Sequence, residues 1–199
     1  MPNQRASDLG LALDASVVIN LLGGGRLREV IRAMLKPVLV VQQVVGEVRQ
    51  DPRKRGADNP ALLTPYLSDQ TIVQVSIEEA ESIMDTYIDL VSAEPNGLGD
   101  GEAATIAYAV IFGHAIALDE RKATAICRER FPQLQVFSSI DLFREAEQRS
   151  SLPREQLIEA VFDALRFARM RVPSIHEEWI KGMLTTEQLA QCPSLRRMI

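Results

Sequence analysis

Short runs of apolar, often β-branched residues alternate along the chain with longer segments in which apolar residues recur every three or four positions. The short runs are typical of strands buried on both faces, and the longer segments of helices with one apolar face. This alternation predicts an α/β fold around a parallel sheet. The five expected strands are Leu9 to Leu13, Pro37 to Val41, Thr71 to Ser76, Ala115 to Leu118 and Leu134 to Phe137.

Helical periodicity fills most of the sequence between these strands. In the segment from Ile77 to Ser92 the apolar residues fall on one stripe, and Glu78 and Glu79 at its start favour the positive end of a helix dipole. Gly113 is expected to end a helix of small and apolar residues. The other expected helices of this part of the chain are Arg26 to Leu35, Gln42 to Gln50, Glu102 to Phe112, Arg121 to Arg130 and Asp141 to Gln148.

The pattern changes after Ser150, where helical segments continue and no further strand is expected. An amphipathic helix is expected from Arg154 to Arg171, followed by short helical pieces at 177–183 and 186–191. We therefore divide the chain into a sheet domain, residues 1–150, and a C-terminal helical extension, residues 151–199. The wide apolar face of the long helix predicts that it packs on the sheet domain or on a second copy of the chain.

Composition and charge indicate the class of protein and its expected location. The 199 residues are 46% apolar and 25% charged, which is typical of a globular protein. The only two cysteines, Cys127 and Cys192, form neither a disulfide framework nor a zinc-binding spacing. The first ten residues lack the basic start and apolar run of a signal peptide, and no apolar stretch is long enough to cross a bilayer, so we expect a cytoplasmic protein with no membrane partner. A net charge of -5 argues against attraction of nucleic acid to the whole surface, although a local site could still bind it.

Acidic residues follow two of the expected strands directly. Asp14 closes the first strand and Asp119 the fourth, and ligands of parallel sheets bind outside the carboxyl ends of strands. Glu47 lies one turn into the helix after the second strand, and Glu102 begins the small-residue helix. Crowded carboxylates repel one another unless a cation joins them. Because these ligands offer only oxygen, the set predicts Mg²⁺ or Mn²⁺ as the cofactor.

The sequence around these acids resembles the motifs of PIN-domain proteins. The run from Leu13 to Leu22 (LDASVVINLL) is similar to their opening, in which a strand ends in an acid that is followed one residue later by Ser or Thr. The run from Val44 to Val48 (VVGEV) is similar to their second acidic motif. Gly101 to Ala107 (GEAATIA) and Ile116 to Arg121 (IALDER) look like the third and fourth, in the form of a branch with GE and LDE signatures.

This resemblance extends over about Leu9 to Gln148 and implies a three-layer αβα fold with a five-stranded parallel sheet. It also implies that carboxylates hold Mg²⁺ or Mn²⁺ and that the protein is a ribonuclease that cleaves single-stranded RNA. Many such proteins are toxins of toxin–antitoxin pairs, so an antitoxin protein is a candidate partner, as is a second copy of the chain. The implied catalytic and metal-binding residues are Asp14, Glu47, Glu102 and Asp119.

Each of these acids also has a structural interpretation. Asp14 could cap the following helix through the amide of Ser16 or Val17, and Ser16 is then either a donor that orients a carboxylate or an ordinary first-turn serine. Glu47 could be a solvated helix residue, and Glu102 could interact only with the positive end of the helix dipole.

Two neighbouring acids compete for the same roles as members of this set. Asp100 is the rival of Glu102, and Glu120 is the rival of Asp119.

Basic and glycine-rich segments give weaker signals. Arg121 or Lys122 is expected to offset charge on a phosphate, and a polar loop, residues 52–60, carries further candidate RNA contacts that could equally be solvated: Arg53, Lys54 and Arg55. The glycines at 23–25 and 97–101 follow helical segments, which does not suit a phosphate-binding loop, so flexible connections are expected there.

Two other functions remain open from the sequence. One is a non-catalytic PIN-like module that binds RNA or protein in regulation, with the helical extension as its partner surface. The other is an unrelated α/β enzyme that binds a mononucleotide without a divalent metal.

Overall fold

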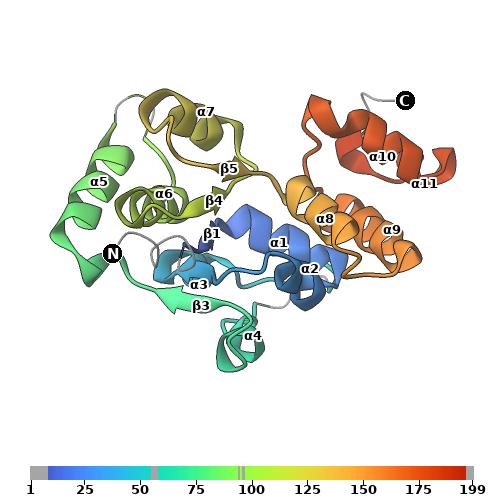
Figure 1. The fold of residues 1–199 in the computed structure, drawn as a ribbon, viewed down its shortest axis with the longest axis horizontal. Helices are drawn as coiled ribbons and strands as arrows, with labels where there is room; N and C mark the ends of the chain where they lie inside the picture. Colours follow the sequence, from blue (N-terminus) through green and yellow to red (C-terminus); the bar gives the residue numbers. More distant parts are fainter. Residues whose placement is uncertain (1–8, 55–57, 94, 96, 196–199) are drawn as a thin grey trace, which may run out of the picture.

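The computed structural model describes residues 9–54, 58–93, 95 and 97–195. Five parallel strands form one sheet in the order β3-β2-β1-β4-β5, as shown in Figure 1. All five strands expected from the sequence are present, each shorter than predicted at its ends. Their bounds are β1 Leu11–Leu13, β2 Val38–Val41, β3 Val73–Val75, β4 Ala115–Ala117 and β5 Val136–Phe137.

Helices cover both faces of this sheet, which confirms the three-layer α/β fold (Figure 1). One layer holds α5 (Glu81–Ser92), α6 (Asp100–Phe112) and α7 (Arg121–Arg130). The opposite layer holds α1 (Ala15–Gly24), α2 (Leu27–Ala33), α8 (Ser139–Gln148) and α9 (Arg154–Asp163). Shorter elements complete the chain: α3 (Gln42–Glu47), α4 (Thr64–Ser68), α10 (Glu177–Met183), α11 (Thr186–Ala190), 3₁₀ turns η1 (Ile77–Glu79), η3 (Ser174–His176) and η4 (Pro193–Leu195), and a π-helical turn η2 (Ala164–Ala168).

The pleat of the central strand β1 explains the two layers. Leu11 and Leu13 contribute to the core shared with α1, α2, α8 and α9, whereas Ala12 between them contributes to the core shared with α6 and α7. Successive side chains of a strand point to opposite faces, so a strand without polar residues places apolar groups in both cores.

The strand order places a switch point beside β1. The chain proceeds outward from β1 to β2 and β3, then returns to the other side of β1 with β4 and β5. Leu13 pairs with Ala117, and the amide of Asp14 donates to the carbonyl of Ala117 at 3.2 Å. Asp14 and the residues after Ala117 therefore lie at the same edge of the sheet, where parallel α/β folds bind ligands.

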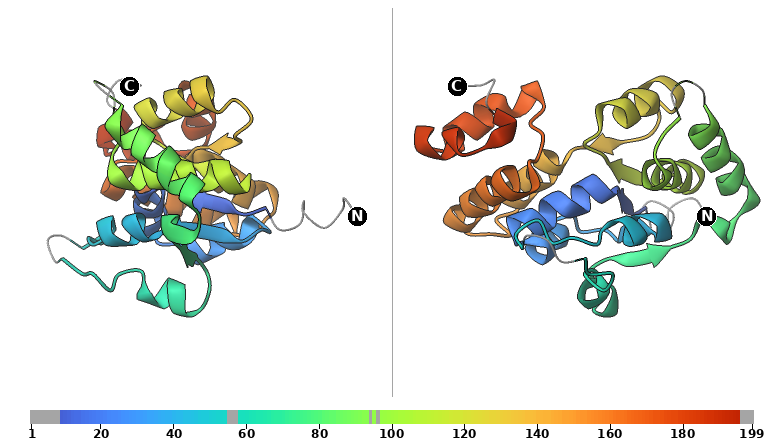
Figure 2. Two further views of the ribbon diagram at one scale, coloured as in Figure 1. Left: turned by 90° about the vertical axis from the view of Figure 1, so that its left-hand side faces the viewer. Right: turned by 180° about the vertical axis from the view of Figure 1, so that it is seen from behind.

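The helices after residue 150 continue the core of the sheet domain. The helix α9 and the turn η2 pack on α1, which confirms one of the two expected contacts of the extension. The views in Figure 2 show α10 and α11 at the same end of the molecule as α8 and α9. The division at residue 150 stays a prediction. No helix in the described part of the chain has the length and apolar character needed to span a bilayer.

The glycines at 23–25 are not a flexible connection, so that prediction was wrong. Gly23 and Gly24 are the last residues of α1, and Gly25 with φ 69° caps the helix. A Cβ on Gly24 would lie 2.8 Å from the carbonyl oxygen of Ala160, and one on Gly23 would lie 2.7 Å from Cβ of Ala168. Small residues let α1 and the C-terminal segment approach closely, which sequence spacing alone does not show.

The structure also differs from the helical predictions. The segment from Ile77 to Ser92 is divided at Ala80, whose backbone is extended, into η1 and α5. The helix expected from Arg154 to Arg171 is α-helical only to Asp163. The π turn η2 follows it, and helical structure ends at Arg169, whose φ is 57°. The short helix α4 was not predicted, since its five residues carry no clear apolar stripe and include Pro65 in the first turn.

We predict that Gly24→Ala destabilises the protein, because its methyl group would overlap the backbone of α9. Overpacking of this kind costs about 1–3 kcal/mol, which corresponds to a fall in melting temperature of roughly 3–10 °C for a chain of this size. The matched control is Gly182→Ala, whose Cβ meets nothing within 4 Å and which should gain about 0.5–1 kcal/mol. Equal melting temperatures of the two variants would show that the α1–α9 contact is not tight.

Candidate functional site

Asp14 combines the capping role with burial at the sheet edge. It is the N-cap of α1, and its Oδ2 accepts hydrogen bonds from the amide of Ser16 at 3.2 Å and from the hydroxyl of Ser16 at 2.6 Å. The capping interpretation is thus correct in geometry, and Ser16 orients the carboxylate. A cap needs no burial, yet only 3% of Asp14 is exposed.

Asp119 is held by two side chains that sequence analysis missed. Its Oδ2 accepts from Asn20 Nδ2 at 2.6 Å and from the hydroxyl of Ser139 at 2.5 Å, and its Oδ1 accepts from the amide of Ser139 at 2.9 Å. Asn20 lies on α1 and Ser139 begins α8, so these bonds join three elements. Asn20 is the one polar residue in the apolar run VVINLL, and this isolated polarity was the available signal.

The carboxylates of Glu47 and Glu102 accept hydrogen bonds at the N-terminus of α6. Oε1 of Glu47 accepts from the amide of Gly101 at 2.9 Å, and Oε2 of Glu102 accepts from the amide of Gly99 at 3.2 Å. A Cβ on Gly101 would lie 2.6 Å from one carboxylate oxygen of Glu47, so glycine is required for this approach. Both glutamates therefore interact favourably with the positive end of the α6 dipole, as the structural interpretation of Glu102 predicts.

Burial and mutual repulsion act on all four acids. Burial is the largest cause that raises the pKa of Asp14, Glu47, Glu102 and Asp119. The negative charge of Asp14 further raises the pKa of each of the other three. Asp14 is therefore within electrostatic reach of each of the other three acids.

Asp100 and Glu120, the two alternative acids, act electrostatically on members of this group. Asp100 accepts a hydrogen bond from the Tyr87 hydroxyl and raises the pKa of Glu47. Glu120 is exposed, and its charge raises the pKa of Asp14 and of Glu102.

The predicted cations differ in their distance from the acids. Lys122 donates to the carbonyl of Gly97 and lowers the pKa of Glu102, and so it lies near the group. Arg53 instead pairs with Asp163 at 2.7 Å beside Gly23, at the far end of α1 from Asp14.

Of the other two basic residues of the polar loop, Lys54 is among the described residues. Lys54 pairs with Asp51 at 3.7 Å, and Arg55 lies outside the described residues.

The C-terminal segment reaches the acids. A cavity of about 280 Å³ is lined by Ser16, Asn20, Asp119 and Glu120 together with residues 168–171. Arg171 Nη1 donates to the carbonyl of Asp119 at 2.7 Å, while its Nε is buried with no hydrogen-bond partner among the described residues. The π turn η2 ends at Arg169, which is left-handed, and the residues at this point line the cavity beside Asp119.

The donor chemistry of the site fits a hard divalent cation. Four carboxylates supply only oxygen, which Mg²⁺ and Mn²⁺ prefer. In the part of the chain that the structure describes, no three His, Cys, Asp or Glu side chains stand close enough to hold an ion together. Side chains of Glu47 and Glu102, each anchored through one carboxylate oxygen only, would have to adjust toward Asp14 and Asp119.

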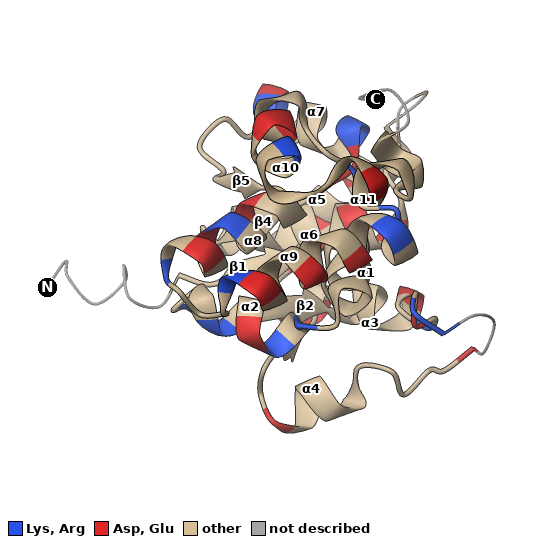
Figure 3. Cartoon of the chain, turned by 90° about the vertical axis from the view of Figure 1, so that its right-hand side faces the viewer, with Lys and Arg blue, Asp and Glu red and all other residues tan. Residues whose placement is uncertain are grey.

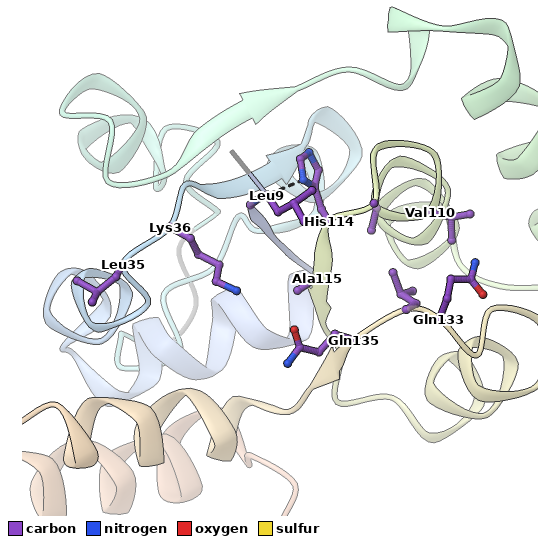
Figure 4. A pocket seen from close by; sticks show the side chains of 12 residues that line it. Leu9, Leu35, Lys36, Val110, His114, Ala115, Gln133 and Gln135 are labelled. Atoms are coloured by element: carbon purple, nitrogen blue, oxygen red, sulfur yellow. Dashed lines mark hydrogen bonds between the residues drawn. The ribbon is translucent and has the colours of Figure 1, made fainter. Parts of the chain in front are cut away.

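A second cavity, of about 550 Å³, opens at the opposite, amino-terminal edge of the sheet (Figure 4). Its lining includes Lys36, Gln133 and His114, whose Nδ1 accepts from the amide of Gly10 at 3.0 Å. Among the described residues, no carboxylate lines it. The acidic site and this cavity are therefore separate features of the molecule.

We predict that Asp14→Asn melts at a higher temperature than the wild type at pH 7.5 in EDTA. The pKa of Asp14 is higher in the folded protein than in the unfolded chain. Above that raised pKa the charged carboxylate therefore lowers the free energy of unfolding of the wild type. As the pH falls toward the usual value of 3.8 the wild-type carboxyl protonates, and the difference in melting temperature narrows. Saturating Mn²⁺, at about ten times its Kd, should stabilise the wild type by about 1.4 kcal/mol and the variant by much less.

Asp85→Asn is the control for this measurement, because Asp85 is exposed on α5 and the change removes the same charge. It should melt like the wild type with and without Mn²⁺. An Asp14→Asn variant that melts lower in EDTA and gains as much from Mn²⁺ would show that these acids do not form one group.

Comparison with known protein families agrees with this geometry. The model of the family DUF3368, described as a PIN domain, matches residues 11–183. This range includes the sheet, the four acids and the segment that carries Arg171. No curated protein and no solved structure gives a match. Since the family model covers most of the chain, the protein belongs to the PIN-domain family.

Proposed function

We propose that this protein is a metal-dependent endoribonuclease that cleaves phosphodiester bonds of single-stranded RNA. Its membership of the PIN-domain family supports a nuclease-type function in general. Two linked observations support the finer proposal: Asp14 and Asp119 follow neighbouring strands at the switch point of the sheet, and Asp14 raises the pKa of Glu47, Glu102 and Asp119, all of which are raised by burial as well. Such a group is unfavourable for folding alone and suits the binding of a cation.

Asp14, Glu47, Glu102 and Asp119 would hold Mg²⁺ or Mn²⁺. When bound, the ion would supply a more acidic water for attack on phosphorus and positive charge beside the leaving oxygen. Ser16 fixes the carboxylate of Asp14, and the pair Asn20 and Ser139 fixes that of Asp119. Hydrogen bonds of this kind keep acidic groups oriented in the absence of substrate.

Basic residues near the acids would stabilise the substrate. Arg171 donates to the carbonyl of Asp119, and Arg121, two residues after Asp119, lines a cavity together with Arg171, so a guanidinium would lie near a phosphate bound at this carboxylate. A guanidinium can donate two parallel hydrogen bonds to phosphate oxygens and can offset charge that develops on them.

Two further assignments depend on partners. A toxin role requires an antitoxin protein, and a homodimer requires a second copy. The non-catalytic alternative, a PIN-like RNA- or protein-binding module, predicts no metal-dependent cleavage at nanomolar protein concentrations. Copurification of a small protein encoded by an adjacent reading frame would support the toxin role.

Substitution of the buried acids tests the proposal. We expect Asp14→Asn, Glu102→Gln and Asp119→Asn each to reduce Mn²⁺-dependent cleavage of a labelled single-stranded RNA by at least about 100-fold. Circular dichroism should be unchanged, and Asp85→Asn should cleave like the wild type. Wild-type rates in both Asp14→Asn and Asp119→Asn would refute the nuclease assignment.

Gly101→Ala tests the position of Glu47 without removing a carboxylate. The new methyl group would displace the Glu47 carboxylate, whose contact with Gly101 is its anchor. We expect kcat/KM to fall roughly 10-fold to 100-fold with little change in melting temperature, because the displaced atoms end a flexible side chain. Gly46→Ala is the matched control, since its Cβ meets nothing within 4 Å. Equal activities of the two variants would mean that the contact of Glu47 with Gly101 has no part in the reaction.

A further inference from the structure

A groove of about 340 Å³ runs beside the acidic site, between α7 and the segment from Arg171 to His176. Its floor is the carboxyl end of β5, which contributes Phe137 and Ser138. One wall is a face of α7 formed by residues 121, 124, 125 and 128. The other wall comes from the C-terminal extension, so neither part of the chain makes this groove alone.

Three of the residues that line the groove are arginines. Among the described residues, Arg121, Arg128 and Arg171 form no ion pair. On the same helix, Arg130 pairs with Asp89, as most arginines elsewhere on the surface pair with an acid. Figure 3 shows both signs of charge along α2 and α9, which is the usual mixed pattern of a surface.

The single carboxylate of the groove is already engaged. Asp141 accepts hydrogen bonds from the amide of Ser138 at 2.8 Å and from its hydroxyl at 2.7 Å, and its Oδ1 lies 3.0 Å from Nε2 of the buried His176. One carboxylate against three guanidiniums leaves the lining of the groove with an excess of positive charge. In a protein of net charge -5, this excess marks the groove as a local site for an anion.

Arg171 connects the groove to the acids. It lines both the groove and the cavity that contains Asp119, and it donates to the carbonyl of Asp119. Arg121 and Arg128 are two helical turns apart, about 10 Å along the axis. Successive phosphates of a polymer that follows the groove can contact both without either side chain turning toward the other.

We propose that this groove binds the phosphate backbone of a single-stranded RNA next to the bond that is cleaved, and that the C-terminal extension thereby completes the substrate site. The substrate class rests on the proposed function. The groove contacts phosphates and reads no base, so it sets the path of the strand and contributes affinity that depends on salt.

The test compares the full chain with Arg121→Ala/Arg128→Ala in binding to a fluorescein-labelled RNA of about 12 nucleotides, by fluorescence anisotropy in EDTA. The control is Arg32→Ala/Arg130→Ala, which removes the same charge from exposed residues outside the groove. We expect the groove variant to bind at least about fivefold more weakly and to lower the slope of log K against log salt by about 1.4, or 0.7 for each lost contact. The control variant should keep the wild-type slope.

A second variant and a cleavage assay separate failure of the groove proposal from failure of the nuclease proposal. Both arginines are exposed, so the groove variant should fold, and the single change Arg128→Gln, with a slope lower by about 0.7, provides a second reading. If the wild type binds RNA through the groove but does not cleave it with Mn²⁺, the nuclease proposal fails and the groove stands. If the wild type cleaves RNA while the groove variants keep wild-type affinity and slope, the groove proposal is wrong, and an acidic protein partner becomes its candidate occupant.

Discussion

Repulsion among buried carboxylates is the constraint on which the rest of this site depends. Asp14 and Asp119 follow neighbouring strands of a parallel sheet, so the fold itself places them at one edge, 3% and 7% exposed. Each charge there is disfavoured by burial, and Asp14 raises the pKa of the three acids around it. A protein gains nothing in stability from such an arrangement. The proposed metal-dependent function explains why the sequence maintains it.

The surrounding structure keeps these acids in place at a cost in packing. Ser16, Asn20 and Ser139 occupy positions that apolar residues could fill, and Gly101 lacks a side chain so that Glu47 can approach α6. The C-terminal segment adds to this support. Gly23 and Gly24 let it pack closely on α1, and its π turn then directs Arg171 to the carbonyl of Asp119.

The sequence predicts those features that depend on local pattern. The strands follow from short apolar runs, and Asp14, Ser16 and Asp119 follow from their positions at strand ends. The hydrogen bond between Asn20 and Asp119 joins residues 99 positions apart, which no local pattern specifies. The glycines of α1 were misread because close approach of helices depends on tertiary packing. Arg171 had no signal at all, since its place beside Asp119 depends on the course of the chain after the π turn.

Proton release on metal binding tests the central claim most directly. If Mn²⁺ binds carboxylates whose pKa values are raised, it displaces protons at low pH, and the number of protons displaced falls as the pH rises. Isothermal titration of the wild type with Mn²⁺, in two buffers of different ionisation enthalpy at each pH, measures the number of protons released. The account predicts saturable binding with proton release that declines as the pH rises. Absence of binding, or binding without proton release at low pH, would contradict it.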